Sequence, residues 1–366
     1  EPEEIIMLRT SLTIIVARFA YLLFWPVPVD PKSWDAPQDA GLSGDFAPNN
    51  ALDNVDIIKL GDTHGPEGLA FIDGEVYMAT REGWIVRLNE RTGELSKWVN
   101  TQGSPLGLAV DANQNLLIAD AYKGLLLVTP EGDLSVLTNS IDGVPIVYAD
   151  DLDVTEEGKI YFSDASTKFG AEGSGGTYES SLLDITEHGG HGRLLVYDPA
   201  DKSTQVVMDG LNFANGVAVA ADSSFVLVNE TGTYRVQKYW LKGEKAGQSE
   251  VIIDNLPGFP DNIVRGRDGR FWVGLVSPRS QPLDDLSDLP MLRKISQRLP
   301  AFMQLQATAY SHVFAIDQDG NVLTSLQGPN STHHTNTGAL ETDDWLYISS
   351  LHAENLARIS RADAGI

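Results

Sequence analysis

Hydrophobic and polar residues alternate along most of this chain in short runs that are separated by turn signals. Two segments show the pattern in full: GPEGLAFIDGEVYMATREGWIVRLNERTGELSKWV from Gly65 and SPLGLAVDANQNLLIADAYKGLLLVTPEGDLSVLT from Ser104. A period of two residues predicts half-buried β-strands, and pairs such as Asp-Gly and Glu-Gly predict the tight turns between them. Each segment therefore predicts a unit of about four short antiparallel strands.

The same unit returns four more times, beginning at Tyr148, Phe213, Phe259 and Asn336. A four-stranded sheet cannot bury both faces alone, and radial closure of six such sheets gives each one two neighbours. The fold class is therefore all-β, a six-bladed β-propeller spanning residues 55–366. A β-sandwich would not explain six spaced recurrences of one turn motif. The last copy is short of strands, so Val55–Leu60 is predicted to complete that blade and close the ring.

Two insertions interrupt the repeat. Residues 169–192 are rich in glycine and predict a mobile flap. Residues 277–310 contain LSDLPMLRKISQRLPAFMQLQ, where apolar residues recur at helical intervals, which predicts a helical insertion in the fifth blade. This second insertion is interpreted either as a lid or membrane-facing helix on the active face, or as an ordinary helix packed over a blade.

The N-terminal residues 1–30 predict a hydrophobic helix that serves as a membrane anchor, followed by a linker over residues 31–54. The apolar run from Ile5 to Trp25 is long enough to cross a bilayer, although it contains Arg9 and Arg18. Arg9 can reach the headgroups, whereas Arg18 lies deeper and needs a partner, for which a polar residue on another membrane helix is one candidate. The alternative is an amphipathic helix that docks on the protein itself.

Composition narrows the function classes. The 366 residues include 51 Asp and Glu against 26 Lys and Arg, a formal net charge of -25. Such a field repels phosphate backbones, so no nucleic-acid partner is expected, and it disfavours electrostatic binding to anionic lipid. The chain has no cysteine, which excludes disulfides, thiolate zinc sites and cysteine nucleophiles. A surplus of carboxylates can instead hold a hard cation.

Carboxylate and amide side chains stand at the same point of four repeats, where each innermost strand begins. They are Glu67, Asp150 and Asp151, Asn215, and Asp261 with Asn262. In a propeller these strand starts converge on one mouth of the central channel. Any one of them could be an ordinary turn residue, but four coincidences at one repeat position favour a metal site. Oxygen donors without His or Cys indicate Ca²⁺ or, with more water, Mg²⁺ or Mn²⁺.

Several of these strings resemble the six-bladed calcium-dependent propellers, a group that includes paraoxonases, gluconolactonase-type lactonases and strictosidine synthase-like proteins. The strings are GPEG, YFSDASTKF, GRLLVYDP, FANGVAV, FVLVNETGTYRV and GFPDNIVRGRDGRFWVGL, and the chain looks most similar to the membrane-anchored strictosidine synthase-like proteins. The resemblance spans roughly Leu60 to Ser360. It implies a catalytic-type Ca²⁺ held by the residues of the following set: Glu67, Asn215, Asp261, Asn262 and either Asp150 or Asp151.

The chain also departs from these families. The histidine dyad that activates water in paraoxonases would fall at Leu106 and near Ala121, so it is missing. The catalytic glutamate of strictosidine synthase would fall in GPNSTHHTNTGAL, which has no carboxylate between Gly328 and Leu340. Alkaloid synthesis is therefore not expected.

These observations predict a membrane-anchored, Ca²⁺-dependent esterase or lactonase that acts on a small hydrophobic ester or lactone, with the metal polarising the carbonyl group. The residues that could deprotonate water are Asp151, Asp261, Glu67, His64, His333 and His334. The alternative is a propeller that keeps its metal for structure and binds a ligand or a partner chain in a membrane complex. The propeller is predicted to be extracytoplasmic, periplasmic or lumenal, because that placement fits calcium supply.

Overall fold

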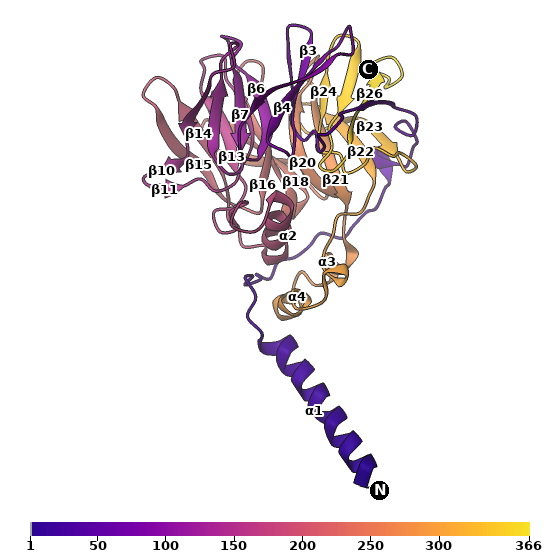
Figure 1. The fold of residues 1–366 in the computed structure, drawn as a ribbon. Helices are drawn as coiled ribbons and strands as arrows, with labels where there is room; N and C mark the ends of the chain where they lie inside the picture. Colours follow the sequence, from indigo (N-terminus) through magenta and orange to yellow (C-terminus); the bar gives the residue numbers. More distant parts are fainter. Residues whose placement is uncertain (1) are drawn as a thin grey trace.

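The computed structural model describes residues 2–366 as one long helix followed by six four-stranded sheets arranged around a channel (Figure 1). The predicted six-bladed propeller is thereby confirmed. Each of the first five sheets takes its four strands in chain order, from the innermost to the outermost. Inner strands such as Ala214–Val219 and Phe225–Glu230 are buried along their whole length, whereas an outermost strand such as Leu134–Thr138 is exposed or half-buried.

The first three blades have the following strands. Blade 1 contains β2 Leu69–Ile72, β3 Glu75–Ala79, β4 Trp84–Asn89 and β5 Leu95–Asn100. Blade 2 contains β6 Pro105–Val110, β7 Leu116–Asp120, β8 Gly124–Val128 and β9 Leu134–Thr138. Blade 3 contains β12 Ala149–Val154, β13 Ile160–Asp164, β14 Gly192–Asp198 and β15 Ser203–Leu211, and a small hairpin of β10 Ser140–Ile141 and β11 Val144–Pro145 precedes it.

The remaining blades continue the same order. Blade 4 contains β16 Ala214–Val219, β17 Phe225–Glu230, β18 Arg235–Trp240 and β19 Ser249–Ile253, with η2 Thr231–Thr233 in a turn. Blade 5 contains β20 Gly258–Arg265, β21 Phe271–Pro278, β22 Ser311–Ile316 and β23 Val322–Gly328. Blade 6 contains β24 Ala339–Glu341, β25 Trp345–Ile348, β26 Asn355–Ser360 and β1 Asp56–Lys59.

Blade 6 joins the two ends of the propeller. Strand β1 pairs antiparallel with β26, in a register that places Ile57 opposite Ala357. The run Val55–Leu60 therefore supplies the outer strand of the last blade, as its sequence predicts. The pairing holds the ring closed and leaves only short edges.

The core lies between neighbouring blades. Large side chains such as Trp272 and Phe314 of blade 5 are fully buried, and they belong to clusters that extend into blades 6 and 4 respectively. Such inter-blade packing buries both faces of each sheet, which no blade could do alone.

Both insertions lie on the face of the propeller where the innermost strands begin, which we call the site face. The first insertion follows β13 and contains α2 Thr177–Glu187. The second lies between β21 and β22 and contains α3 Gln281–Asp285, α4 Pro290–Ser296 and η3 Ala301–Met303. All three α-helices lie between the propeller and α1 in Figure 1.

Helix α1, Pro2–Phe24, projects away from the propeller (Figure 1). Its stretch Ile6–Phe24 has a mean hydropathy of 1.6 and none of it is buried, so it is long and apolar enough to cross a membrane. The segment predicted as a linker, residues 31–54, is extended apart from η1 Gly44–Phe46. It is bound to both insertions, because Lys32 N–H donates to Glu187 O at 2.8 Å and Trp34 N–H donates to Ser287 O at 3.1 Å.

Candidate metal centre and adjoining cleft

Four innermost strands are bulged where they approach the channel. The pairing of β12 with β13 shifts between Ala149 and Leu152, and the pairing of β16 with β17 shifts between Ala214 and Val217. Strands β6 and β20 have equivalent shifts. A bulge takes residues out of the regular ladder and re-aims their side chains, so each of these strands can turn a pair of residues toward the channel.

Each of the six blades has an equivalent pair of residues at or just before the start of its innermost strand, and we call the first residue of this pair the ring position. The six ring positions are Glu67, Leu106, Asp150, Asn215, Asp261 and Thr337. The first five line one cavity on the site face. The second position is glycine in blades 1, 2, 4 and 6, and a Cβ at Gly107 would lie only 2.6 Å from the Cα of Asp151. Glycine is therefore required there for neighbouring blades to approach each other.

Unpaired oxygens gather at this ring. Among residues 2–366, the buried atoms without a hydrogen-bond partner include Glu67 Oε2, Asn215 Oδ1 and Asn262 Oδ1. The amide group of Asn262 is held in place by donating to Glu67 Oε1 at 2.9 Å. Behind the ring, Asn229 Nδ2 donates to the main-chain oxygen of Asp261 at 2.6 Å and holds that bulge. Buried polar atoms are rarely left unsatisfied in native proteins, so these oxygens indicate a missing positive partner.

The carboxylates of the ring repel each other. Burial, followed by the charge of Asp261, raises the pKa of Glu67 and of Asp150 well above their ordinary values. Burial also raises the pKa of Asp261 to about 7, although the neighbouring Asn262 N–H and the side chains of Glu67 and Asn215 oppose the rise. Three buried acids with raised pKa values form a site that a divalent cation would stabilise in its ionised form.

The donor set fits calcium by its chemistry. It combines the carboxylates of Glu67, Asp150 and Asp261 with the amide oxygens of Asn215 and Asn262, all at least nine-tenths buried. In the part of the chain that the structure describes, no three Asp, Glu, His or Cys side chains are close enough to form a metal cluster by themselves. The three carboxylates would have to move closer together to bind one ion jointly, and a mixed carboxylate and amide shell is typical of Ca²⁺.

Asp151 does not line the ring cavity, but it lines a small neighbouring cavity together with Glu67 and Asn262. Its Oδ1 accepts from Leu152 N–H and its Oδ2 accepts from Val217 N–H, both at 2.9 Å. Its side chain lines a second cavity farther along the channel, together with Asp153 and Arg265. Of the two aspartates that the sequence leaves open, the structure brings Asp150 to the ring cavity. The catalytic role predicted for Asp151 stays a prediction, made less direct by these two backbone contacts.

The three predicted histidines lie around the ring and not in it. His64 forms an ion pair with Glu82 and is half-exposed. His333 is buried, its Nδ1 is 2.8 Å from Asn355 Oδ1, and burial lowers its pKa. His334 contacts the hydroxyl group of the next residue at 2.9 Å. Within residues 2–366, none of the three lines the ring cavity or the cleft described below.

A fourth histidine, which the sequence motifs did not indicate, lies beside the ring cavity, although within residues 2–366 it lines neither that cavity nor the cleft described below. His352 lines a cavity together with Glu67 and the ring residue Leu106, and its ring packs edge-on against Tyr178 at 5.1 Å. Burial, followed by nearby positive groups, lowers the pKa of His352 below 6.5, so the imidazole is neutral at pH 7. The only available signal was its position, in the turn after β25, which is one of the turns of the site face.

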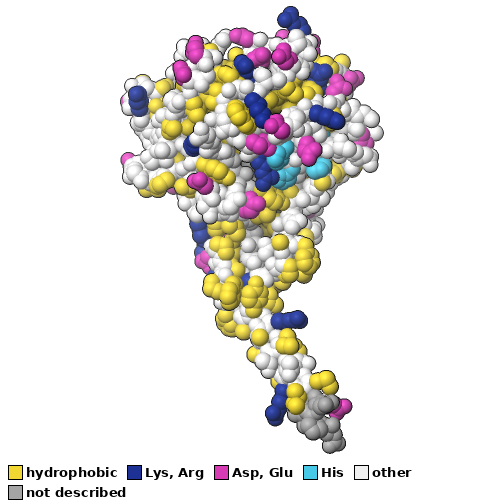
Figure 2. All heavy atoms as spheres, in the orientation of Figure 1, with side chains coloured by type: hydrophobic (Ala, Val, Ile, Leu, Met, Phe, Trp, Pro, Cys, Tyr) yellow, Lys and Arg dark blue, Asp and Glu magenta, His cyan; other side chains and the backbone are white. Residues whose placement is uncertain are grey.

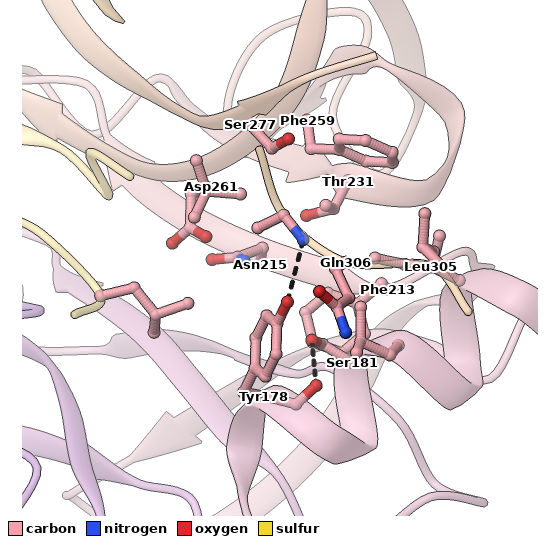
Figure 3. A pocket seen from close by; sticks show the side chains of 15 residues that line it. Tyr178, Ser181, Phe213, Asn215, Thr231, Phe259, Asp261, Ser277, Leu305 and Gln306 are labelled. Atoms are coloured by element: carbon pink, nitrogen blue, oxygen red, sulfur yellow. Dashed lines mark hydrogen bonds between the residues drawn. The ribbon is translucent and has the colours of Figure 1, made fainter. Parts of the chain in front are cut away.

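An apolar cleft of about 480 Å³, including its open mouth, adjoins the ring cavity. Both share Asn215 and Asp261, and Figure 3 shows these two side chains between the aromatic residues Phe259 and Phe213. The two insertions close the cleft from the other side with the following residues: Tyr178, Ser181, Leu182 and Ile185 from α2, and Leu305, Gln306 and Ala307 from the second insertion. Tyr178 joins them, because its hydroxyl accepts from Ala307 N–H at 2.9 Å (Figure 3).

Sequence comparisons identify relatives over almost the whole chain. The family profile described as strictosidine synthase matches residues 150–244, and the profile of the strictosidine synthase-like N-terminal region matches residues 44–88. The adipocyte plasma membrane-associated protein of Rattus norvegicus is 31% identical over 97% of this chain and 98% of its own length. Strictosidine synthase-like protein 3 of Arabidopsis thaliana is 34% identical over 80% of this chain and 81% of its own length.

Solved structures share the fold at low sequence identity. A gluconolactonase of Xanthomonas campestris has a TM-score of 0.59 at 17% identity, and covers 83% of this chain and 91% of its own. A calcium-binding protein of Agrobacterium tumefaciens, regucalcin, has a TM-score of 0.58 at 15% identity, and covers 83% of this chain and 93% of its own. At these identities the likeness concerns the architecture alone.

Proposed function

The chain belongs to the strictosidine synthase-like family, and on this premise we propose that it is a membrane-anchored, calcium-dependent hydrolase of hydrophobic esters or lactones. One observation carries the proposal: buried carboxylate and amide side chains from four blades converge on one cavity that adjoins an apolar cleft, and the side-chain oxygens Glu67 Oε2, Asn215 Oδ1 and Asn262 Oδ1 have no hydrogen-bond partner within residues 2–366. A gluconolactonase and a calcium-binding regucalcin have the same architecture, which supports the proposal at the level of the fold.

The residues that would hold calcium are Glu67, Asp150, Asn215, Asp261 and Asn262. Bound there, the ion would polarise the carbonyl group of an ester or lactone and offset the negative charge that develops on its oxygen.

The chain's own residues would bind and orient the substrate. The aromatic wall of Phe213 and Phe259 suits the apolar part of an ester, and Ser181 and Gln306 offer polar contacts at the rim. We assign His352 as the group that accepts the proton from the attacking water, because burial lowers its pKa and keeps the imidazole neutral at pH 7, and because it lines, together with Glu67, a cavity next to the ring cavity.

Strictosidine synthesis is not proposed. Glu341, in the innermost strand of blade 6, is bound at the opposite end of the channel by Arg270 at 3.0 Å and Arg361 at 2.9 Å. It is therefore committed to ion pairs far from the cleft, and the stretch before Leu340 has no other carboxylate.

The test is hydrolysis of aryl esters and lactones by the full chain in mild detergent, with calcium and with EDTA. We expect turnover that EDTA abolishes and calcium restores. His352→Gln should lower kcat by roughly 100-fold, the scale of a lost general base, while His64→Gln, a change on the same face, should leave it near the wild-type value. Metal-independent turnover, or equal rates in the two variants, would contradict the proposal.

A second function is supported by Arg18. Its side chain is exposed on α1 and, within the described chain, has no hydrogen-bond or ion-pair partner. An arginine deep in an apolar helix favours pairing with a polar group on another membrane helix, so the chain could also act as a binding subunit. Co-purification of a partner chain in mild detergent, lost in Arg18→Leu, is the expected result; a monomer in both cases would contradict it.

We propose an extracytoplasmic propeller, since calcium is available there.

A further inference from the structure

The second insertion exposes a group of large apolar side chains at the end of the molecule nearest α1. They are Leu289, Met291, Leu292, Phe302 and Met303, which we call the apolar foot, and Phe302 is 80% exposed. In Figure 2, hydrophobic side chains gather where the propeller narrows toward the projecting helix. Monomeric soluble surfaces rarely leave such a group of apolar residues uncovered, so the apolar foot indicates a contact surface.

The apolar foot lies at the end of the membrane helix. The guanidinium group of Arg298, nearly buried, donates to Trp25 O at 2.6 Å and to Leu22 O at 2.9 Å. These are the free carbonyl groups at the C-terminus of α1, where a cation is stabilising. Arg298 stands between α4 and Phe302 in the chain, so the apolar foot and Trp25 are tied together. Exposed tryptophan at the end of such a helix is typical of the membrane–water interface.

Helix α4 is also bound to the linker and to the first insertion by several contacts. Arg293 of α4 is fully buried, and it donates to Thr186 O and Ser287 O at 3.0 Å each and to Lys32 O. Trp34 stacks on His188 at 4.0 Å. The membrane helix, the apolar foot and α2 of the cleft therefore form one connected unit.

From these contacts we propose that the apolar foot is immersed in the interfacial layer of the same bilayer that α1 crosses. The inference rests on the proposed membrane anchor. We infer that lipid covers the apolar foot, because the apolar foot lies at the end of α1, the helix that crosses the membrane. The attraction is apolar: of the nearby cations, Lys294 faces Asp30 at 3.3 Å and Arg298 is turned inward, so a neutral bilayer suffices.

Immersion would bring the cleft to the membrane surface. Leu305, Gln306 and Ala307 line the cleft and follow Met303 of the apolar foot by only a few residues. An ester dissolved in the bilayer would then reach the cleft without crossing bulk water. The substrate class is accordingly long-chain esters or lactones that partition into lipid.

The test measures depth directly. The chain has no cysteine, so single cysteines can be introduced and spin-labelled in the full chain reconstituted in phosphatidylcholine vesicles. Phe302→Cys reports on the apolar foot, Ile15→Cys reports on the anchor, and Leu323→Cys is the control. Leu323 is 51% exposed and lies at the start of β23, on the face opposite the site face.

We expect collisions with oxygen to dominate over collisions with a water-soluble nickel chelate at positions 15 and 302, and the reverse at position 323. If the label at position 302 is as accessible to nickel as the label at 323, while the label at position 15 lies in the bilayer, the apolar foot is not immersed. That result would overturn the immersion of the apolar foot and leave the anchor in place. A label at 15 in water would overturn the anchor and this inference together. None of these readings depends on calcium or on hydrolysis, so they are separate from a failure of the proposed activity.

The substrate class has its own readout. Phe302→Ser combined with Met303→Ser should lower kcat/KM for a long-chain ester dissolved in vesicles by roughly tenfold, the scale of one lost apolar contact, and leave a water-soluble short-chain ester unchanged. Leu323→Ser should change neither. Equal losses on both esters would show damage to the cleft and would overturn the assignment of membrane-dissolved substrate.

Discussion

Removing one ring carboxylate should stabilise the calcium-free protein and abolish its response to calcium. Asp261 is buried, its pKa is raised to about 7 from 3.8 by burial, and its charge adds to the repulsion at Glu67 and Asp150. The difference of 3.2 between those two values corresponds to about 4 kcal/mol. Asp261→Asn removes this cost and keeps the shape of the side chain.

Proton linkage gives the direction in which the free energy of unfolding changes with pH. The folded chain binds the proton of Asp261 more tightly than the unfolded chain does, so its stabilising contribution is complete below pH 3.8 and is lost as the pH rises to about 7. In EDTA the wild-type protein should therefore be more stable at about pH 5.5 than at about pH 8, and Asp261→Asn should flatten that dependence. Calcium reverses the preference, because a ligand at 100 times its Kd adds about 2.7 kcal/mol to the folded state.

Urea unfolding of the full chain in mild detergent, followed by tryptophan fluorescence, measures these free energies in EDTA and in calcium. We expect Asp261→Asn to raise the free energy of unfolding at about pH 8 by up to 4 kcal/mol in EDTA and to remove the gain from calcium. A variant that is less stable than wild type in EDTA, or that still gains stability from calcium, would refute the reasoning. So would a wild-type protein whose stability in EDTA rises with pH over this range.

Three further changes test the ring and its supports. Asp150→Asn should weaken calcium binding by roughly 10- to 100-fold, whereas Asp151→Asn should change it by less than about threefold. Titration calorimetry on both variants measures the difference, and equal losses of affinity would contradict the assignment of Asp150 to the ring. Arg293→Leu removes the donor to Thr186 O and Lys32 O, while Ser287 O keeps Trp34 N–H; it should lower the free energy of unfolding by about 1–3 kcal/mol for each carbonyl left unpaired and expose residues 31–40 to limited proteolysis, with wild-type protection as the contrary result. Gly216→Ala places a Cβ against Ile263 N and 2.5 Å from Asp261 O in the next blade and should cost about 1–3 kcal/mol or more, while Gly338→Ala, whose nearest contact is 3.3 Å, should cost less; the reverse order would contradict the close approach of the blades.

The repeat carries most of the fold. Turn glycines and period-two alternation recur six times, and they predict the blades, the ring of polar residues and the closing role of Val55–Leu60. The repeat also distinguishes Asp150 from Asp151. When the pair is aligned with Glu67 and Gly68, Asp150 takes the ring position and Asp151 takes the position that faces the other cavity.

The parts that escaped prediction depend on contacts between distant segments. The glycine-rich first insertion predicted a flap, whereas the structure has α2, whose buried Asp184 accepts a hydrogen bond from Ser166 at 2.5 Å. His352 has no motif around it and is brought next to Glu67 only by the closure of the ring. Residues 31–54 have linker composition, yet the main-chain groups of Lys32 and Trp34 bind both insertions. No local pattern encodes such pairings, because the partners are more than a hundred residues away.

Calcium binding measured by titration calorimetry on the full chain tests the central claim most directly. We predict one site of high affinity per chain, whose affinity falls by at least about 100-fold in Asn215→Ala, since that buried amide oxygen has no hydrogen-bond partner within the described chain. Absence of calcium binding in the wild-type protein, or an unchanged affinity in Asn215→Ala, would contradict it.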